Sequence, residues 1–269
     1  MLKQYFLKIN EFLMQIVSLT SDYGSKDYYL AELKASILNG KNDFSIIDIS
    51  HEIDRFDIVQ AAFYLNNAIK SFSKGSIHIV AVNCNYRRRS EYICFERDGH
   101  YFIGPNNGVF SLMFDDLDEN KIYIISPANA ENTSVNAIFA HAAAYLGHGL
   151  PMEEIGPTVE IFNSKLVIQP VVTSSQIRAT IIHIDHFENV VVNLKKELFE
   201  KVRNDRKFEL YYKPNDPITF LSKDYGDVSI GDALAFFNSS GYLEIAINMD
   251  KASSMLNLMK NEMIQINFY

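Results

Sequence analysis

The hydrophobic pattern of this chain changes character a little past its middle. In the first half, short apolar runs of strand type alternate with segments whose apolar residues recur at helical spacing. From about residue 166 onward nearly every apolar run is of strand type, with turn signals between the runs. Alternating strands and helices predict a mainly parallel sheet covered on both faces. A succession of strands predicts an antiparallel barrel or sandwich.

These patterns predict the elements and the domain boundaries. In the first half we expect strands at 15–20, 45–49, 76–82 and 121–125, a hairpin at 91–97 and 101–104, and helices at 27–38, 58–69 and 137–146. In the second half we expect strands at 166–172, 176–184, 190–194, 208–212, 234–237, 243–247 and 263–268, with one helix at 195–202. We therefore predict an N-terminal extension at 1–13, an α/β domain at 14–165 and an all-β barrel domain at 166–269. The boundary lies near Gly156-Pro157 or in the stretch after it.

Composition narrows the class of partner. The formal net charge of −8 argues against nucleic acid, whose phosphates attract basic surfaces. The basic run Arg87-Arg88-Arg89 is isolated, and it is either a solvated turn or a contact with an anion. No apolar run approaches the ~18 residues of a membrane helix. Two cysteines, Cys84 and Cys94, are too few for a disulfide framework and fit a reducing cytoplasm, where we expect the protein to reside.

Familiar cofactor and metal signatures are missing from the sequence. There is no glycine-rich phosphate loop of either common type and no HExxH zinc motif. His183, Asp185 and His186 could be metal ligands, but on a strand the third would face away from the first two. We expect neither a metal nor a separate cofactor.

Four turn-like segments place polar groups where predicted strands end, which is where α/β sheets bind ligands. They are 21–27 (SDYGSKD), 105–108 (PNNG), 185–189 (DHFEN) and 237–246 (FNSSGYLEIA). Each has a structural alternative by itself. Asp27, for example, could be the N-cap of the following helix, and the second segment could be a plain turn.

Taken together and in this order, the segments resemble one family. SDYGSKDYYLAELKASIL, IIDISHEIDRFDIVQAAFYL, GHYFIGPNNGVFSL, ENVVVN and NSSGYLEIAIN are similar to segments of the S-adenosylmethionine hydroxide adenosyltransferase (S-adenosylmethionine hydrolase) family. That family also contains the fluorinating and chlorinating enzymes. The resemblance runs from about Ile16 to Phe268. It implies homotrimers in which each ligand lies between the N-terminal domain of one subunit and the barrel of the next.

The resemblance assigns the sugar and methionine ends of the ligand to carboxylates. Asp22 matches the aspartate that holds both ribose hydroxyls, since its oxygens accept O–H donors. Asp27 and Asp185 match carboxylates near the methionine ammonium. Phe56 lies where fluorinating members carry an aromatic residue that shapes the ribose pocket, and Ser240 stands where those members have a carboxylate-binding arginine.

The resemblance assigns the adenine to residues of the second half. Phe187 and Tyr225 fall where family aromatics flank the ring, with core packing as the alternative. Asn189 matches the asparagine that pairs with the adenine edge, and Asn248 and Met249 belong to the backbone stretch that meets adenine.

The nucleophile side departs from the family pattern. The reaction there is in-line displacement at C5′ of the ribose, with methionine leaving as a neutral thioether and water held by aspartate, arginine and histidine. In this chain Asn83 stands at the place of the aspartate and Ser134 at that of the histidine. Ser90 stands at the place of the arginine, and Arg89 lies one residue before it. His141 lies within a predicted helix and is expected to pack there.

Three hypotheses follow. The chain is a hydrolase-class enzyme with a rearranged water site made of Asn83, Arg89 and Ser134, or a non-catalytic module that binds an adenosyl compound, or an assembly protein that keeps only the trimer fold. A halogenating enzyme is a weaker alternative, since Tyr86 would crowd the matching loop.

Overall fold

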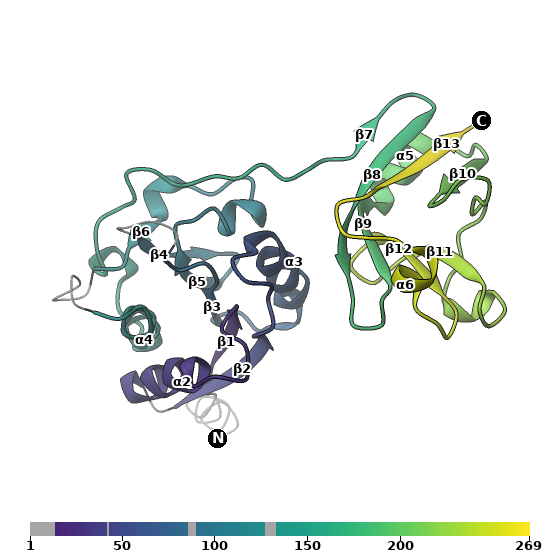
Figure 1. The fold of residues 1–269 in the computed structure, drawn as a ribbon. Helices are drawn as coiled ribbons and strands as arrows, with labels where there is room; N and C mark the ends of the chain where they lie inside the picture. Colours follow the sequence, from purple (N-terminus) through teal and green to yellow (C-terminus); the bar gives the residue numbers. More distant parts are fainter. Residues whose placement is uncertain (1–13, 42, 86–89, 127–132) are drawn as a thin grey trace, which may run out of the picture. The chain divides into compact units, whose positions relative to one another are not determined.

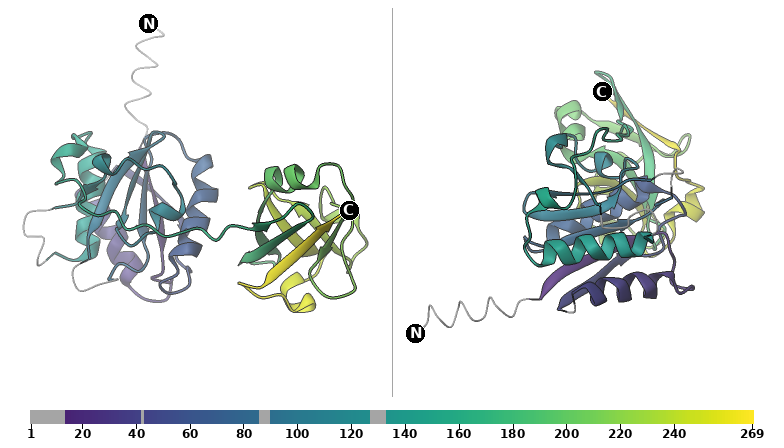
Figure 2. Two further views of the ribbon diagram at one scale, coloured as in Figure 1. Left: turned by 90° about the horizontal axis from the view of Figure 1, so that it is seen from above. Right: turned by 90° about the vertical axis from the view of Figure 1, so that its left-hand side faces the viewer.

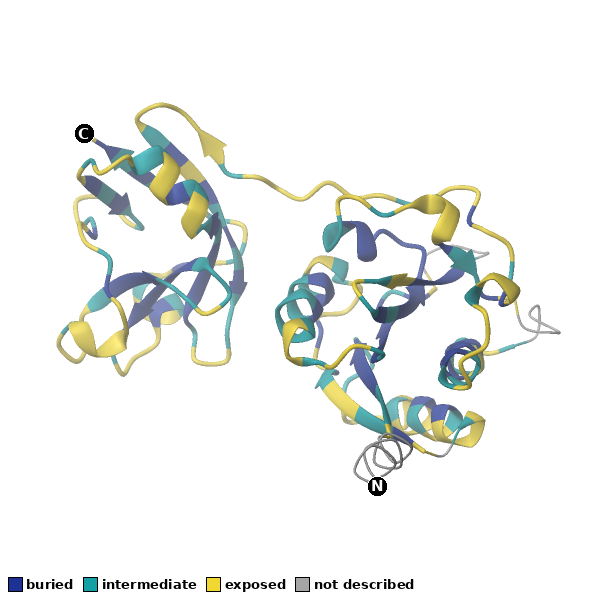
Figure 3. Ribbon diagram, turned by 180° about the vertical axis from the view of Figure 1, so that it is seen from behind, coloured by how far each residue is buried: buried dark blue, intermediate teal, exposed yellow. Residues whose placement is uncertain are grey.

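The computed structural model describes residues 14–41, 43–85, 90–126 and 133–269, and the chain divides into two compact units, with the division between Leu166 and Val167 in the sequence. Each unit has its own core and is described by itself. In Figure 3 the buried residues concentrate on the strands and on the inward faces of the helices in each unit.

The N-terminal unit is built on one six-stranded sheet with strand order β2-β1-β3-β5-β4-β6. Its strands are β1 (Gln15–Ser21), β2 (Phe44–Ser50), β3 (Ile77–Ala81), β4 (Tyr92–Arg97), β5 (His100–Pro105) and β6 (Tyr123–Ile124). The first three and β5 run parallel, while β4 is antiparallel to its neighbours β5 and β6. The predicted mainly parallel sheet is therefore confirmed.

Helices cover both faces of this sheet. Helices α2 (Tyr29–Gly40) and α4 (Val135–Gly147) pack together on one face, and α3 (Ile58–Ala68) lies on the other (Figures 1 and 2). A Cβ at Gly40 would lie 3.1 Å from Cβ of Ala144, so small residues allow the close approach of α2 and α4. Short 3₁₀ helices complete the unit at Ile69–Ser71, Phe110–Leu112, Glu119–Lys121 and Met152–Glu154.

The C-terminal unit is one curled antiparallel sheet of seven strands: six have the order β10-β13-β8-β9-β12-β11, and the seventh, β7, pairs with β8. Its elements are β7 (Val171–Val172), β8 (Gln176–Ile184), β9 (Val190–Lys195), α5 (Lys196–Arg203), β10 (Phe208–Tyr211), the 3₁₀ helix η6 (Tyr225–Asp227), β11 (Ala233–Phe237), β12 (Tyr242–Ile247), α6 (Ala252–Leu256) and β13 (Met263–Phe268). The pairing path ends at β10 and β11, so the predicted all-β character is confirmed, whereas full closure into a barrel is not.

Several predicted elements need correction. The first helix begins at Tyr29, with Tyr28 at the N-cap and no side-chain cap, so Asp27 is not the cap of this helix. The strand predicted at 166–172 is reduced to two paired residues, because the apolar run before β7 has no neighbouring strand; Leu166 and Ile168 are 96% and 63% exposed. Helix α6 was not predicted. His141 of α4 is exposed rather than packed in the core.

The predicted hairpin is confirmed, and its turn explains why it forms. Strands β4 and β5 pair from Tyr92 with Pro105 to Arg97 with His100. The two residues between them, Asp98 and Gly99, have φ values of 54° and 83°. Such a two-residue turn matches the twist of antiparallel strands, and an Asp-Gly pair tolerates it best.

A histidine lies fully buried in the parallel part of the sheet. The Nδ1 atom of His78 is 2.6 Å from Oγ of Ser18 on β1, and its Nε2 is 3.1 Å from Nδ1 of His100 on β5. Burial, and secondarily the nearby His100, lower the pKa of His78 to about 4. The imidazole is therefore neutral in the folded protein well below the pH at which a free histidine gains its proton.

This burial predicts a loss of stability in acid. Between pH 6.5 and 4 the unfolded chain binds a proton at His78 that the folded chain does not, so the free energy of unfolding falls as the pH decreases through that window, by up to about 3 kcal/mol. Urea unfolding at a series of pH values measures this. His78→Gln should flatten the decline, whereas His141→Gln, at an exposed site, should leave it intact. Equal slopes for the wild type and His78→Gln would contradict the assignment.

Candidate functional site

The carboxyl ends of β1, β2 and β3 converge on one carboxylate. Asp22 follows β1 directly, and its Oδ2 accepts the backbone N–H groups of Phe56 at 3.0 Å and Asn83 at 3.1 Å. Phe56 lies in the loop after β2 and Asn83 in the loop after β3. The carboxyl edge of a parallel sheet is the usual place for a ligand site, and here one side chain holds the two adjacent loops in place.

Both donors have unusual backbone conformations. Phe56 and Asn83 have φ values of 67° and 50°, in the left-handed region that costs a side-chain-bearing residue free energy. The bonds to Asp22 offset part of that cost. The buried Asn107 adds support, since its Nδ2 donates to the carbonyl oxygens of Val82 and Asn83 at 3.1 and 3.2 Å. Phe56 as a whole is 68% exposed, so its position fits contact with a ligand better than core packing.

The loop after β1 is also tied to the loop after β2. Gly24 donates its N–H to the carbonyl of His51 at 2.8 Å, and Glu52 Oε1 accepts from the N–H and hydroxyl of Ser25 at 3.0 and 2.7 Å. Asp27 lies beyond these ties and is exposed, while Asp22 is half-buried. The loop therefore presents two carboxylates, one fixed and one facing solvent.

A serine, a histidine and an aspartate lie in line beneath this loop. Oγ of Ser21 is 2.7 Å from Nδ1 of His51, whose Nε2 is 3.1 Å from Oδ1 of Asp48. The set has the residue types of a hydrolytic triad, but Ser21 is fully buried and cannot meet a substrate. Asp48 also pairs with Lys34 Nζ at 2.6 Å. The set positions the residue before Asp22 and does not supply a nucleophile.

The predicted water-site residues are only partly brought together. Asn83 contacts Asp22 through its backbone, as described above. Ser134 is the N-cap of α4, and its Oγ accepts the N–H of Ala137 at 3.3 Å. The first turn of α4 meets the loop after β1 through Tyr23, whose hydroxyl donates to Oδ1 of Asn136 at 3.3 Å. Arg89 lies outside the described residues, as does Tyr86.

In the C-terminal unit, a tight turn between β8 and β9 is organised by Asp185. Its Oδ1 accepts the backbone N–H groups of Phe187 and Asn189 at 2.9 and 2.8 Å, and its Oδ2 accepts from the side-chain nitrogen of Asn189 at 3.1 Å. The turn leaves Phe187 71% exposed, whereas Asn189 is 6% exposed. Packing therefore does not account for Phe187.

A chain of hydrogen bonds continues from Asn189 across the outer face of the sheet. Asn189 Nδ2 donates to the hydroxyl oxygen of Tyr225 at 3.3 Å, and that hydroxyl donates to Oε1 of Glu244 at 2.7 Å. Oε2 of Glu244 accepts from Nδ2 of Asn238 at 3.0 Å. Burial and the bond to Glu244 raise the pKa of Tyr225 far above its usual range, so the phenol keeps its proton. Glu244 is 5% exposed and was not predicted, because the alternation in LEIA does not reveal what covers each face.

The other predicted residues of this unit divide between the two ends of β12. Asn248 and Met249 follow β12 at the end where β8 turns into β9, because β9 and β12 pair in antiparallel fashion. Met249 is 83% exposed with a φ of 60°. Ser240 lies in the turn before β12, where its carbonyl accepts from Lys195 Nζ at 2.7 Å. It is therefore at the opposite end of that strand from the residues predicted to meet adenine.

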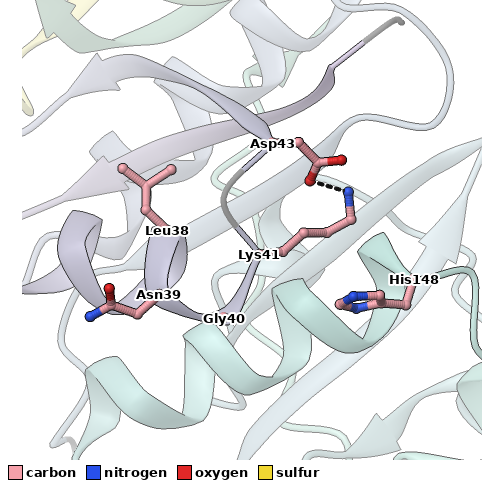
Figure 4. A pocket seen from close by; sticks show the side chains of 6 residues that line it. All are labelled: Leu38, Asn39, Gly40, Lys41, Asp43 and His148. Atoms are coloured by element: carbon pink, nitrogen blue, oxygen red, sulfur yellow. Dashed lines mark hydrogen bonds and ion pairs between the residues drawn. The ribbon is translucent and has the colours of Figure 1, made fainter. Parts of the chain in front are cut away.

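A surface depression of the N-terminal unit lies away from these groups. Among the described residues no three His, Cys, Asp or Glu side chains gather as metal ligands, and no helix in the described ranges is long and apolar enough to cross a membrane. A depression at the ends of α2 and α4 (Figure 4) is lined by Leu38, Asn39, Gly40, Lys41, Asp43 and His148. It precedes β2 and so lies at the opposite edge of the sheet from Asp22, and Lys41 there is paired with Asp43.

The geometry at Asp22 predicts different effects for two substitutions. Asp22→Ala removes the acceptor of two backbone N–H groups and should lower the free energy of unfolding of the N-terminal unit by about 1–3 kcal/mol. Asp22→Asn can place its amide oxygen where Oδ2 lies and should change stability by less than about 1 kcal/mol. Urea unfolding without ligand measures both. Equal losses for the two variants would show that the N–H contacts do not hold the loops.

Comparisons with known proteins agree with this division of the chain into two units. The model of the SAM hydroxide adenosyltransferase N-terminal domain matches residues 17–156, and that of the C-terminal domain matches residues 179–265. A solved structure from Thermotoga maritima, described as an uncharacterized conserved protein, has a TM-score of 0.82 and 28% identity. It covers 94% of this chain and 100% of its own.

The curated relatives include proteins named as hydrolases and proteins named as fluorinases. The (R)-S-adenosyl-L-methionine hydrolase of Methanocaldococcus jannaschii is 28% identical over 265 residues, with 91% of this chain and 93% of that protein covered. The fluorinase of Actinopolyspora mzabensis is 24% identical over 288 residues, with 93% and 96% covered. Since the two domain models together span most of the sequence, the chain belongs to the SAM hydroxide adenosyltransferase family.

Proposed function

We propose that this protein binds S-adenosylmethionine and cleaves it with water to adenosine and methionine. The observation that carries the proposal is Asp22, whose Oδ2 is held by two backbone amides at the carboxyl edge of the sheet. Its Oδ1 accepts no hydrogen bond from the described residues and is left as the acceptor for ribose hydroxyls. The curated relatives named as hydrolases of this substrate support the same ligand.

In the proposed reaction the oxygen of water bonds to C5′ as the C5′–S bond breaks. The sulfonium sulfur takes the electron pair and leaves as the neutral thioether of methionine, and the proton lost by water passes to solvent. Because the leaving group is already activated, the protein needs only to hold the ribose and align the water. We propose Asp27 for the methionine ammonium, and its exposed carboxylate, five residues after Asp22, supports this role. Asp185 is proposed for the same end of the ligand.

We further propose that the protein acts as a homotrimer in the cytoplasm, with each ligand between two subunits. The residues proposed to bind the ligand are divided between the two units of the chain, which supports this arrangement. The sugar acceptor Asp22 belongs to the first unit, whereas Phe187, Asn189 and Tyr225, proposed to hold adenine, belong to the second. The exposed apolar side chains Ile161, Leu166 and Ile168 support burial of the connecting segment by another subunit.

The second candidate is a non-catalytic adenosyl-binding protein. It is favoured by the environment of the water-site positions: Ser134 is engaged in capping α4, and Asn83 cannot act as a base. An amide can orient water through its oxygen but cannot take its proton. The two candidates differ in turnover and agree on the ligand.

Incubation with S-adenosylmethionine separates these candidates. We expect chromatography to detect adenosine and methionine in equal amounts with the wild-type protein. Asp22→Asn should lose both products and weaken binding in calorimetry by about tenfold or more, because the amide turns one acceptor into a donor while the loops stay in place. Calorimetric binding without product would favour the second candidate, and no binding at all would contradict both.

A substitution at the water site provides a further prediction. Asn83→Asp restores a carboxylate at a left-handed position that aspartate tolerates, and it should raise the hydrolysis rate by roughly tenfold or more by accepting the proton of the attacking water. Asn85→Asp, at an exposed position two residues on, is the matched control and should not change the rate. An unchanged or lower rate in Asn83→Asp would place the water elsewhere.

A further inference from the structure

The side-chain amide of Asn189 has a definite orientation because both of its hydrogens are used within the protein. Nδ2 donates to Oδ2 of Asp185 at 3.1 Å and to the hydroxyl oxygen of Tyr225 at 3.3 Å. Oδ1 of Asn189 accepts no hydrogen bond from the described residues. Oδ1 is not among the solvent-inaccessible polar atoms that lack a hydrogen-bond partner, so it retains some contact with solvent.

The Asp185 side of this arrangement admits only one orientation. Oδ1 of Asp185 is occupied by the backbone N–H groups of Phe187 and Asn189, which leaves Oδ2 facing the Asn189 amide. An ionised carboxylate only accepts hydrogen bonds. Turning the amide of Asn189 would therefore bring two acceptor oxygens together in a buried place, which is costly.

The Tyr225 side imposes the same orientation through two further residues. The amide of Asn238 is fixed by the backbone, because its Oδ1 accepts the N–H groups of Ser240 and Tyr242, both at 3.1 Å. Its Nδ2 therefore donates to Oε2 of Glu244, and the hydroxyl hydrogen of Tyr225 goes to Oε1. The oxygen of Tyr225 then remains as an acceptor toward Asn189. Buried Glu244 thus determines the direction of the hydrogen bonds.

We infer that Asp185 and Glu244 are positioning residues that make Asn189 present only an acceptor to the ligand, and that the site therefore selects 6-aminopurine over 6-oxopurine nucleosides. The 6-amino group of adenine donates to Oδ1 of Asn189, whereas the 6-oxo group of hypoxanthine or guanine would place an acceptor against it. Sites that leave such groups unpaired discriminate strongly. This inference rests on the proposed adenosyl site.

Calorimetric titration with adenosine and with inosine tests the inference, since neither nucleoside contains the methionine part. We expect the wild-type protein to bind adenosine more tightly than inosine by about tenfold or more. Asp185→Asn combined with Tyr225→Phe should reduce that ratio at least about tenfold, toward or past equality. The new amide offers a donor to Oδ1 of Asn189, so that the Asn189 amide turns and presents Nδ2. Phe keeps the ring that is proposed to flank the purine.

A matched control is present in the same unit. The hydroxyl of Tyr212 donates to Oδ2 of Asp216 at 2.9 Å, away from Asn189. The double variant Tyr212→Phe with Asp216→Asn removes the same chemical groups and should leave the nucleoside ratio unchanged. An equal shift in this control would show that the change at Asp185 and Tyr225 acts through general loosening of the unit, and would overturn the inference.

The outcomes distinguish this inference from the proposed function. A wild-type protein that binds neither nucleoside nor S-adenosylmethionine contradicts the proposed function and, with it, the inference. Equal affinity of the wild type for adenosine and inosine, or an unchanged ratio in the double variant, overturns the inference alone. If the double variant binds neither nucleoside, NMR hydrogen exchange decides. The Asn189 side-chain hydrogens should be protected in the wild type and lose protection in the double variant, and equal protection would overturn the inference.

Discussion

The N-terminal unit depends on one carboxylate oxygen that accepts two backbone N–H groups. Through Oδ2 of Asp22, the loops after β2 and β3 are held against the end of β1, and each loop does so with a residue in the left-handed region. A charge-assisted bond to a backbone amide is among the stronger hydrogen bonds in a protein. Oδ1 of the same carboxylate accepts no hydrogen bond from the described residues, so the residue that stabilises these loops is also the one proposed to hold the ribose.

The C-terminal unit relies on a comparable arrangement of buried polar groups. A buried carboxylate is tolerated only when its oxygens are satisfied, and both oxygens of Glu244 have donors. Its partners extend in one direction to the turn at Asn238 and in the other to Tyr225 and Asn189. Glu188 adds a tie at that end of the sheet, pairing with Lys251 Nζ at 2.9 Å and accepting the N–H of Ser254. The residues proposed to meet the purine are thus held by hydrogen bonds rather than by a large apolar core.

Much of the fold follows from local sequence patterns. The spacing of Leu30, Leu33 and Ile37 predicts α2, and the run SIHIVAV predicts the buried β3. The strand predicted for the apolar run before β7 was wrong, because strand propensity yields a strand only where a neighbouring strand offers hydrogen bonds. Closure of the second sheet also depends on pairings between distant strands, which local alternation does not encode.

Fewer of the contacts in the candidate site could be predicted from the sequence. Aspartates after strands are readable, and Asp22 and Asp185 do organise their loops. The importance of Glu244 depends on Tyr225, which is distant in sequence and covers the outer face of β12. The left-handed conformation of Asn83 is likewise accompanied by backbone contacts with Asp22 and Asn107, which are distant in sequence. Such contacts are decided by tertiary packing.

The central claim is that water attacks C5′ of a ribose held by Asp22, and heavy-oxygen water tests it most directly. The protein is incubated with S-adenosylmethionine in water enriched in the heavy oxygen isotope, and the adenosine product is examined by mass spectrometry. The account predicts that the label appears in the 5′-hydroxyl of adenosine and not in methionine. Unlabelled adenosine, label in methionine, or no cleavage would contradict it.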